Sequence, residues 1–89
     1  MLEKTVKAAV RRRLKEVGAY QFWPVQFGLG DVTVDCLGCY KSQFFGIECK
    51  AAGKKPTLHQ ALTLNKIKAA GGLIFVIDSV EEARDLFRS

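Results

Sequence analysis

Residues 35–50, with the sequence DCLGCYKSQFFGIECK, constrain the fold more than any other part of the chain. Together with the three residues before them, they predict two short strands, 32–40 and 43–50, joined by a two-residue turn at Lys41 and Ser42. Tyr40 then faces Gln43, and the register of every other pair in the hairpin follows from this one. Because side chains alternate between the two faces of a strand, the register also decides which residues lie together.

This register sets two carboxylates against each other. Asp35 falls opposite Glu48, with Cβ atoms about 4.5–5.5 Å apart, and like charges in such a pair normally destabilise a sheet. A divalent cation between them would turn the repulsion into binding, with Lys50 beside it on the same face. Asp followed by Glu-x-Lys on a neighbouring strand is typical of metal-dependent nucleases. The alternative is that Glu48 and Lys50 form an exposed pair at the end of a strand and that Asp35 lies in a turn. This alternative stays open because the loop at Lys41 and Ser42 lacks the Asn-Gly or Gly signal that would specify the hairpin turn.

Length and composition exclude several classes of protein. The 89 residues suffice for one domain, 1–89, but not for two cores. No apolar run approaches the roughly 18 residues of a membrane span, so we expect a soluble protein with no membrane partner. The 3 cysteines, an odd number, fit a reducing cytoplasm. A net charge of +5 favours a polyanionic partner. The sequence contains no phosphate-cradling loop, so we expect no nucleotide cofactor.

The residues before the hairpin predict a helix and an edge strand. Apolar residues recur at three- and four-residue steps over 2–17, and Gly18 ends the helix. Glu3 in the first turn is explained by the helix dipole, although it lies close enough to the apolar stripe to lean toward a metal. Residues 19–25 have a strand-like composition, and Pro24 indicates an edge position or the end of the strand. Gly28 and Gly30 mark a loop. Most cations of the helix are assigned to a solvated face: Lys4, Lys7, Arg11, Arg12, Arg13 and Lys15.

The residues after the hairpin complete an α/β pattern. Thr57 caps a helix over 57–70, which two glycines end. The unbroken apolar run 73–78 predicts a buried strand, and strand-helix-strand order implies parallel pairing. Ser79 with Glu82 predicts a second capping box and a last helix to about Arg88. The expected fold is a small mixed β-sheet flanked by helices, in the order α-β-β-β-α-β-α.

Other groups of residues compete with the carboxylates as functional sites. Cys36 and Cys39, with Cys49 and His59 beyond, suggest zinc, but four ligands must converge on one point. Cys36 and Cys39 fall on opposite faces of the predicted strand, so we interpret the cysteines as small buried hydrophobic residues. Gln60 has two interpretations: it completes a capping box at the start of its helix, or it acts in the active site.

The sequence resembles the VRR-NUC family, the virus-type replication-repair nucleases of the PD-(D/E)XK superfamily. The resemblance is carried by Asp35, the ECK triplet at 48–50, the GKKPT loop at 53–57, Gln60 and the LNKIKAAGGLIFVIDS segment that follows. An early acid on the first helix also matches. The resemblance covers nearly the whole chain. It implies a restriction-endonuclease-like core in a stand-alone domain of the kind found in phage and prophage.

The resemblance also implies a site. Mg²⁺ or Mn²⁺ would be held by Glu3, Asp35, Glu48 and the backbone carbonyl of Cys49. Lys50 and Gln60 would lie around the attacked phosphate. The family's proline before the aspartate is Val34 here, which makes Asp31 a rival to Asp35, although the spacing to Glu48 favours Asp35.

The predicted function is a metal-dependent endonuclease that hydrolyses DNA phosphodiester bonds. It would favour branched or junction DNA in phage or prophage replication, recombination or repair, in the cytoplasm of the bacterial host. The metal would polarise the phosphate and lower the pKa of a bound water. Lys50 would hold or deprotonate that water, or stabilise charge in the transition state. Backbone contacts without base reading are expected from Lys54, Lys55, Arg11, Arg12 and Arg13. Two other classes stay open: a non-catalytic DNA-binding module of the same fold, and a basic protein-interaction domain.

The functional unit is expected to be a homodimer. The core of so small a domain is marginal alone. Phe22, Trp23, Val25 and Phe27 form an apolar stretch on a predicted edge strand, which invites another chain to pair with it or cover it. Two sites related by a two-fold axis would address two strands of a junction. The alternative is that Trp23 packs under the first helix of its own chain.

Overall fold

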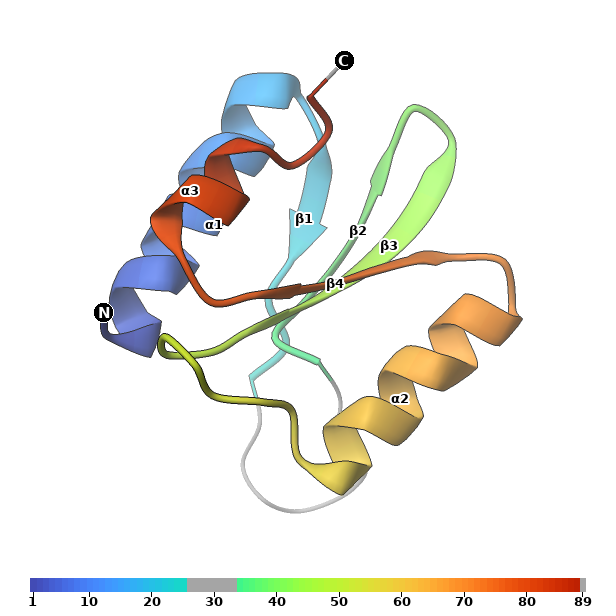
Figure 1. The fold of residues 1–89 in the computed structure, drawn as a ribbon. Coiled ribbons are helices and arrows are strands. Elements are labelled where there is room, and N and C mark those ends of the chain that lie inside the picture. Colours follow the sequence, from blue (N-terminus) through green and yellow to red (C-terminus); the bar gives the residue numbers. More distant parts are fainter. Residues whose placement is uncertain (26–33, 89) are drawn as a thin grey trace.

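A computed structural model describes residues 1–25 and 34–88, and it confirms the predicted fold class. The described residues form a small α/β domain with the expected order of helices and strands (Figure 1). In chain order the elements are α1 (Glu3–Val17), β1 (Tyr20–Phe22), β2 (Cys36–Tyr40), β3 (Gln43–Cys49), α2 (Leu58–Ala69), β4 (Leu73–Ile77) and α3 (Val80–Arg84).

The strands of the described residues form one mixed sheet in the order β1-β2-β3-β4. The pairs β1–β2 and β2–β3 are antiparallel, and β3–β4 is parallel, as the strand-helix-strand order predicts. Lys41 (φ 48°) and Ser42 (φ 69°) both adopt the left-handed conformation that a type I′ hairpin turn requires. Tyr40 therefore pairs with Gln43, and the predicted register is confirmed along the whole of β2.

One face of the sheet packs against α1 and α3 and forms the main core. Figure 1 shows these two helices together on one side of the sheet, with α2 on the other side. Val6, Val10 and Leu14, at four-residue steps, lie along the buried side of α1. The buried members of this core are Val6, Val10, Leu14, Cys36, Phe45, Ile47, Cys49, Ile77, Ala83 and Leu86.

The last helix is shorter than predicted, and Phe87, which follows it, packs against the core. Helix α3 ends at Arg84 rather than near Arg88, and Phe87 adopts a positive φ of 55°. The Phe87 ring stacks on Tyr40 with ring centroids 4.5 Å apart, and its centroid lies 5.3 Å from that of Phe45. Aromatic contacts of this kind stabilise a core beyond simple burial of area. The chain therefore leaves the helix early and places an aromatic side chain over the sheet.

Other predicted boundaries differ because tertiary position overrides the local pattern. Strand β1 is shorter than 19–25, and β2 begins at Cys36 rather than at residue 32. The prediction that 73–78 is a buried strand is wrong in part. Strand β4 is the last strand of the sheet order, so one edge has no strand neighbour, and Leu73 and Val76 remain 41% and 38% exposed. The predicted loop at Gly28 and Gly30, together with Phe27 and Asp31, lies outside the described residues.

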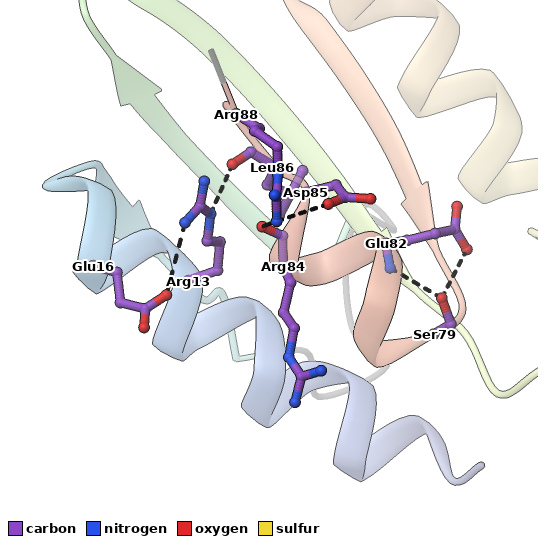
Figure 2. Close-up of polar contacts among 8 residues, drawn as sticks. All are labelled: Arg13, Glu16, Ser79, Glu82, Arg84, Asp85, Leu86 and Arg88. Carbon is purple, nitrogen blue, oxygen red and sulfur yellow. Dashed lines mark hydrogen bonds and ion pairs between the residues drawn. The ribbon is translucent and has the colours of Figure 1, made fainter.

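The helix ends follow the predicted signals with one difference. Gly18 ends α1 with a φ of 77°. At the start of α3, Ser79 Oγ accepts a hydrogen bond from the backbone N–H of Glu82 at 3.1 Å. The Glu82 carboxylate accepts a hydrogen bond from the Ser79 hydroxyl at 3.3 Å, which differs from the reciprocal backbone bond of a full capping box (Figure 2). Within the described residues, no helix combines the length and the apolar character needed to cross a membrane.

Candidate active site

Asp35 and Glu48 lie at the end of the hairpin that is remote from its turn. Glu48 is near the end of β3, and its neighbours Ile47 and Cys49 point into the main core, so Glu48 points to the opposite face. Asp35 lies directly before β2 rather than within a strand. Its Oδ2 accepts a hydrogen bond from the backbone N–H of Cys49 at 2.8 Å. This bond holds the Asp35 carboxylate beside the end of β3, as the register predicted.

Glu48 is a buried carboxylate with an incomplete set of partners. The residue is only 1% exposed, and its Oε1 accepts a hydrogen bond from Gln60 Nε2 at 3.2 Å. Its Oε2 is buried without a hydrogen-bond partner among the described residues. Burial, and then the neighbouring Asp35 carboxylate, raise the pKa of Glu48 to about 8, against the opposing effect of Lys50. The site therefore contains an acidic group whose negative charge is poorly compensated.

Gln60 forms the predicted cap of its helix and also contacts the Glu48 carboxylate. Its side-chain Oε1 accepts a hydrogen bond from the backbone N–H of Thr57 at 2.9 Å, and the backbone N–H of Gln60 donates to Thr57 Oγ1 at 3.3 Å. These bonds form the predicted capping box of α2. The other end of the same amide donates to Glu48. The capping box thus fixes the orientation of the group that anchors Glu48 Oε1.

Lys7 contacts the site, although no sequence pattern separates it from the other cations of α1. Its Nζ lies 3.3 Å from Glu3 Oε2 and 3.5 Å from Asp35 Oδ1. Burial acts to lower the pKa of Lys7, but the Asp35 and Glu3 carboxylates outweigh burial and raise it. The Glu3–Lys7 spacing of one helical turn is visible in the sequence, whereas the contact with Asp35 depends on how α1 packs against the sheet.

Lys50 follows β3 directly and lies close enough to Glu48 to favour its ionised form. The backbone N–H of Lys50 donates to the carbonyl of Ile77 at 2.9 Å, which ties this residue to the end of β4. The structure therefore brings Asp35, Glu48, Cys49, Lys50 and Gln60 to one end of the sheet. Glu3, the remaining predicted ligand, connects to this group through Lys7.

The donor set fits a hard divalent cation. Mg²⁺ prefers carboxylate oxygens and keeps several of its waters, so one or two carboxylates suffice to bind it. Within the described ranges, no three side chains of Asp, Glu, His or Cys converge closely enough to form a metal site by themselves. Asp35 and Glu48 are the two carboxylates at this end of the sheet that could hold such an ion. A bound cation would favour the ionised form of Glu48, whose Oε2 has no hydrogen-bond partner among the described residues, over the protonated form that its raised pKa favours near neutral pH.

The cysteines do not form the competing zinc site. Cys36, Cys39 and Cys49 are free thiols, and Cys36 and Cys39 lie on opposite faces of one strand, as predicted. The interpretation as buried hydrophobic residues is confirmed for Cys36 and Cys49 and wrong for Cys39, which is exposed because its side chain lies on the sheet face away from the main core. Burial raises the pKa of Cys36 to about 11 and that of Cys49 further. Both buried thiols therefore stay protonated near neutral pH in the metal-free protein.

The arginine run of α1 divides between two surfaces. The Arg11 guanidinium lies over the Trp23 ring, 4.2 Å from its centroid. Arg13 Nε donates to the carbonyl of Leu86 at 2.8 Å, and Figure 2 shows this side chain in the space between α1 and α3. The predicted alternative for Trp23 is confirmed in part, because it is half-buried and packs against the core of its own chain.

A basic hollow, defined here by Arg12, Arg13, Arg84 and Arg88, lies between α1 and α3 and has a volume of about 300 Å³. Arg88 pairs with Asp85 at 3.0 Å, and Arg13 pairs with Glu16 at 3.9 Å (Figure 2). Arg12 and Arg84 are exposed, and their side chains have no polar partner among the described residues. The sequence pattern indicates Arg12 and Arg13 but not Arg84 and Arg88, because only the packing of α3 on α1 brings the four arginines together.

Lys54 and Lys55 are exposed in the loop between β3 and α2. With Gly53 they line a second hollow, of about 470 Å³, that also contacts Asp78 and Glu82. Asp78 Oδ2 accepts a hydrogen bond from the backbone N–H of Gly53 at 3.1 Å, which positions this loop against the end of β4. The two lysines therefore lie on the loop that follows Lys50.

Neither a protein-family model nor a curated protein matches this sequence.

Proposed function

We propose that this protein is a metal-dependent nuclease that hydrolyses DNA phosphodiester bonds. The observation that carries the proposal is the buried Glu48 carboxylate, whose Oε2 lacks a donor among residues 1–25 and 34–88, while the Asp35 carboxylate lies beside it. A structural ion pair would have placed a cation on that oxygen. An arrangement that leaves it open favours binding of Mg²⁺ or Mn²⁺ from solution.

The side chains around the metal have separate tasks. Asp35 and Glu48 would hold the ion, and each has one oxygen already anchored, by the Cys49 N–H and by Gln60 respectively. When bound, the ion would polarise a phosphodiester and lower the pKa of a coordinated water. Lys50 would hold or deprotonate the attacking water, or stabilise negative charge on the phosphate. Glu3 and the carbonyl of Cys49 are further ligands on the strength of the family resemblance.

The DNA would be bound through its phosphates. Lys54 and Lys55 lie on the loop next to the site, and the basic hollow adds four arginines on the α1–α3 side. Contacts of this kind position a duplex without reading its sequence. The resemblance to VRR-NUC nucleases favours branched or junction DNA of phage or prophage as the substrate, and it favours a restriction-endonuclease-like assignment of the sheet.

A homodimer is also part of the proposal. The sheet face opposite the main core exposes Tyr20 (68%), Phe22 (53%) and Phe44 (47%), which with Leu37, Gly38 and Cys39 line an apolar hollow of about 310 Å³. A second copy would remove this surface from water. Light scattering tests the dimer: a monomeric mass both alone and on a four-way junction would exclude it.

The decisive experiment measures cleavage of linear and four-way-junction DNA in Mg²⁺ and Mn²⁺. Asp35→Asn, Glu48→Gln and Lys50→Met should each lower the single-turnover rate by at least about a hundredfold, the range expected for loss of a metal ligand or of charge stabilisation. DNA binding in EDTA should change little. Glu81→Gln, which removes an exposed acid of α3, is the control and should cut at the wild-type rate.

Each outcome assigns the protein to a class. Cleavage by Asp35→Asn and Glu48→Gln at wild-type rates would place the site elsewhere. DNA binding with no cleavage by the wild-type protein would favour the non-catalytic DNA-binding module. The absence of salt-dependent DNA binding would favour a basic protein-interaction domain.

A further inference from the structure

Lys7 occupies the gap between two acidic residues that belong to different elements. Its ammonium group is 3.3 Å from Glu3 on α1 and 3.5 Å from Asp35 at the start of β2. An ordinary helix-surface pair would join Lys7 to Glu3 alone. The second ion pair reaches Asp35, whose side chain is only 13% exposed, so it lies in a partly desolvated position. Ion pairs at such positions are screened less by salt than pairs in open solvent.

We propose that Lys7 is an internal counter-ion of the Asp35–Glu48 site that competes with a divalent cation for Glu3 and Asp35. The inference rests on the proposed metal site and adds the control of its occupancy. Without an ion, Lys7 neutralises Asp35 and links it to Glu3. When an ion binds, the ammonium group leaves the gap, and its flexible stem carries it toward solvent.

The distances require this exchange. A Mg²⁺ ion that bridged Glu3 and Asp35 would approach each carboxylate oxygen to about 2.0–2.1 Å. The same oxygens now lie 3.3 and 3.5 Å from the Lys7 ammonium. The two cations cannot share that space, because their mutual repulsion at such a separation would offset much of the attraction of either to the carboxylates. Glu3 Oε2 and Asp35 Oδ1 would therefore become available to the ion after Lys7 has moved.

The free oxygens of the two carboxylates support the same exchange. Asp35 Oδ2 is held by the Cys49 N–H and Glu48 Oε1 by Gln60. The oxygens left for an ion are Glu48 Oε2, which has no partner in the described part of the chain, and Asp35 Oδ1, which Lys7 contacts. Lys7 thus covers one of the two positions that the proposed ion needs, and leaves the other open.

The test compares Lys7→Met with Lys4→Met, because both remove one positive charge from the start of α1. Lys4 is exposed and has no ion pair among the described residues. Mn²⁺ binding is measured by isothermal titration calorimetry, and melting temperature is measured in EDTA. Lys7→Met should bind Mn²⁺ about fivefold more tightly than wild type, as expected for loss of one competing ion pair. It should also melt at a lower temperature than Lys4→Met in EDTA.

Three results would overturn the proposal. The first is a Mn²⁺ affinity of Lys7→Met equal to or weaker than that of wild type. The second is an equal gain in affinity in Lys4→Met, which would reduce the effect to general charge. The third comes from Asp35→Asn: if Lys7→Met lowers the EDTA melting temperature as much in that background as in wild type, Lys7 does not act through Asp35.

The proposed function fails in a different way. If neither wild type nor Lys7→Met binds Mn²⁺ at millimolar concentration, the metal site and the competition are both rejected. The Asp35→Asn comparison still decides whether Lys7 is the counter-ion of Asp35. Tight Mn²⁺ binding by both proteins with equal affinity would keep the metal site and reject the role of Lys7.

Discussion

At the scale of single residues, the carboxyl group of Glu48 is almost fully withdrawn from water while one of its oxygens has no donor among the described residues. Burial and the Asp35 charge raise its pKa to about 8, from an ordinary value of 4.5. Between these two pH values the folded protein retains a proton that the unfolded chain has released. The free energy of unfolding must therefore fall as pH rises through this window.

The pH dependence gives a prediction for the metal-free protein. In EDTA, the stability of wild type should decrease from pH 5 to pH 8.5, and Glu48→Gln should flatten that decrease. At pH 8.5 we expect Glu48→Gln to be more stable than wild type by about 1–3 kcal/mol, since the variant has no charge to desolvate. Urea unfolding at several pH values measures this, with Glu81→Gln as the control. Parallel curves for wild type and Glu48→Gln would contradict the raised pKa.

Adding a metal should reverse the pH dependence of stability in the wild-type protein, so that stability rises rather than falls with pH. A metal ligand must be deprotonated, so Mn²⁺ competes with the proton on Glu48 and its stabilising effect should grow up to about pH 8.

Gln60 gives a second prediction at the residue scale, because its amide serves both the helix cap and Glu48. Thr57→Ala removes a cap acceptor only and should cost about 1 kcal/mol of stability with little change in cleavage. Gln60→Ala removes the cap and also the donor to Glu48, so it should lose more stability and also cleavage rate. Urea unfolding and single-turnover rates on the same preparations separate the two variants. Equal losses on both measures would mean that the contact with Glu48 has no energetic role.

At the scale of elements, the β2–β3 hairpin has a turn geometry that its residues do not favour. Lys41 and Ser42 both have positive φ, where L-residues other than Gly, Asn and Asp are strained. The register is nonetheless the one that the two-residue turn requires. Pairing and core contacts along the strands, in which Phe45 and Ile47 are fully buried, therefore outweigh the strain of the turn.

This strain predicts a stabilising double substitution. Replacing Lys41 by Asn and Ser42 by Gly supplies the preferred type I′ residues and should raise stability by about 1 kcal/mol. The gain is reduced slightly by loss of the Lys41 contact with the Tyr40 ring, 5.3 Å from its centroid. The midpoint of urea unfolding measures the effect. The cleavage rate should not change, because the turn is at the opposite end of the hairpin from Asp35. A destabilised variant would show that the present residues make contacts worth more than the strain.

At the scale of the whole molecule, two groups of basic residues lie on separate surfaces. Lys54 and Lys55 lie on the loop beside the carboxylates, and the basic hollow lies between α1 and α3. Figure 1 shows α1 and α3 grouped on one side of the sheet and α2 on the other. A DNA molecule that reaches both surfaces would contact more phosphates than one bound at the loop alone.

Salt dependence tests whether the basic hollow contacts DNA. Arg12→Ala with Arg84→Ala should weaken binding and lower the slope of log affinity against log salt by about 1 to 2, one for each lost phosphate contact. Lys66→Ala with Lys68→Ala removes the same charge from exposed positions of α2 and serves as the control. Fluorescence anisotropy at several salt concentrations measures the slopes. Equal slopes for the two double variants would exclude the hollow as a DNA contact.

The sequence by itself determined the features that depend on neighbours along the chain. The cap at Thr57 and the end of α1 at Gly18 follow from local pattern, because hydrogen bonds over a few residues decide them. The pairing of Tyr40 with Gln43 follows from the alternation of side chains along the two strands. The hairpin register in turn carried Asp35 to the neighbourhood of Glu48, since a two-residue turn leaves only one pairing.

Only the tertiary structure decided the features that depend on how distant elements pack. The ion pair of Lys7 with Asp35 depends on the docking of α1 against the sheet. The position of Arg84 in the same hollow as Arg12 depends on the packing of α3 on α1. The exposure of Val76 depends on the edge position of β4, which an unbroken apolar run does not reveal. In each of these cases the side chain alone has an ordinary preference, and its surroundings come from residues far away in the chain.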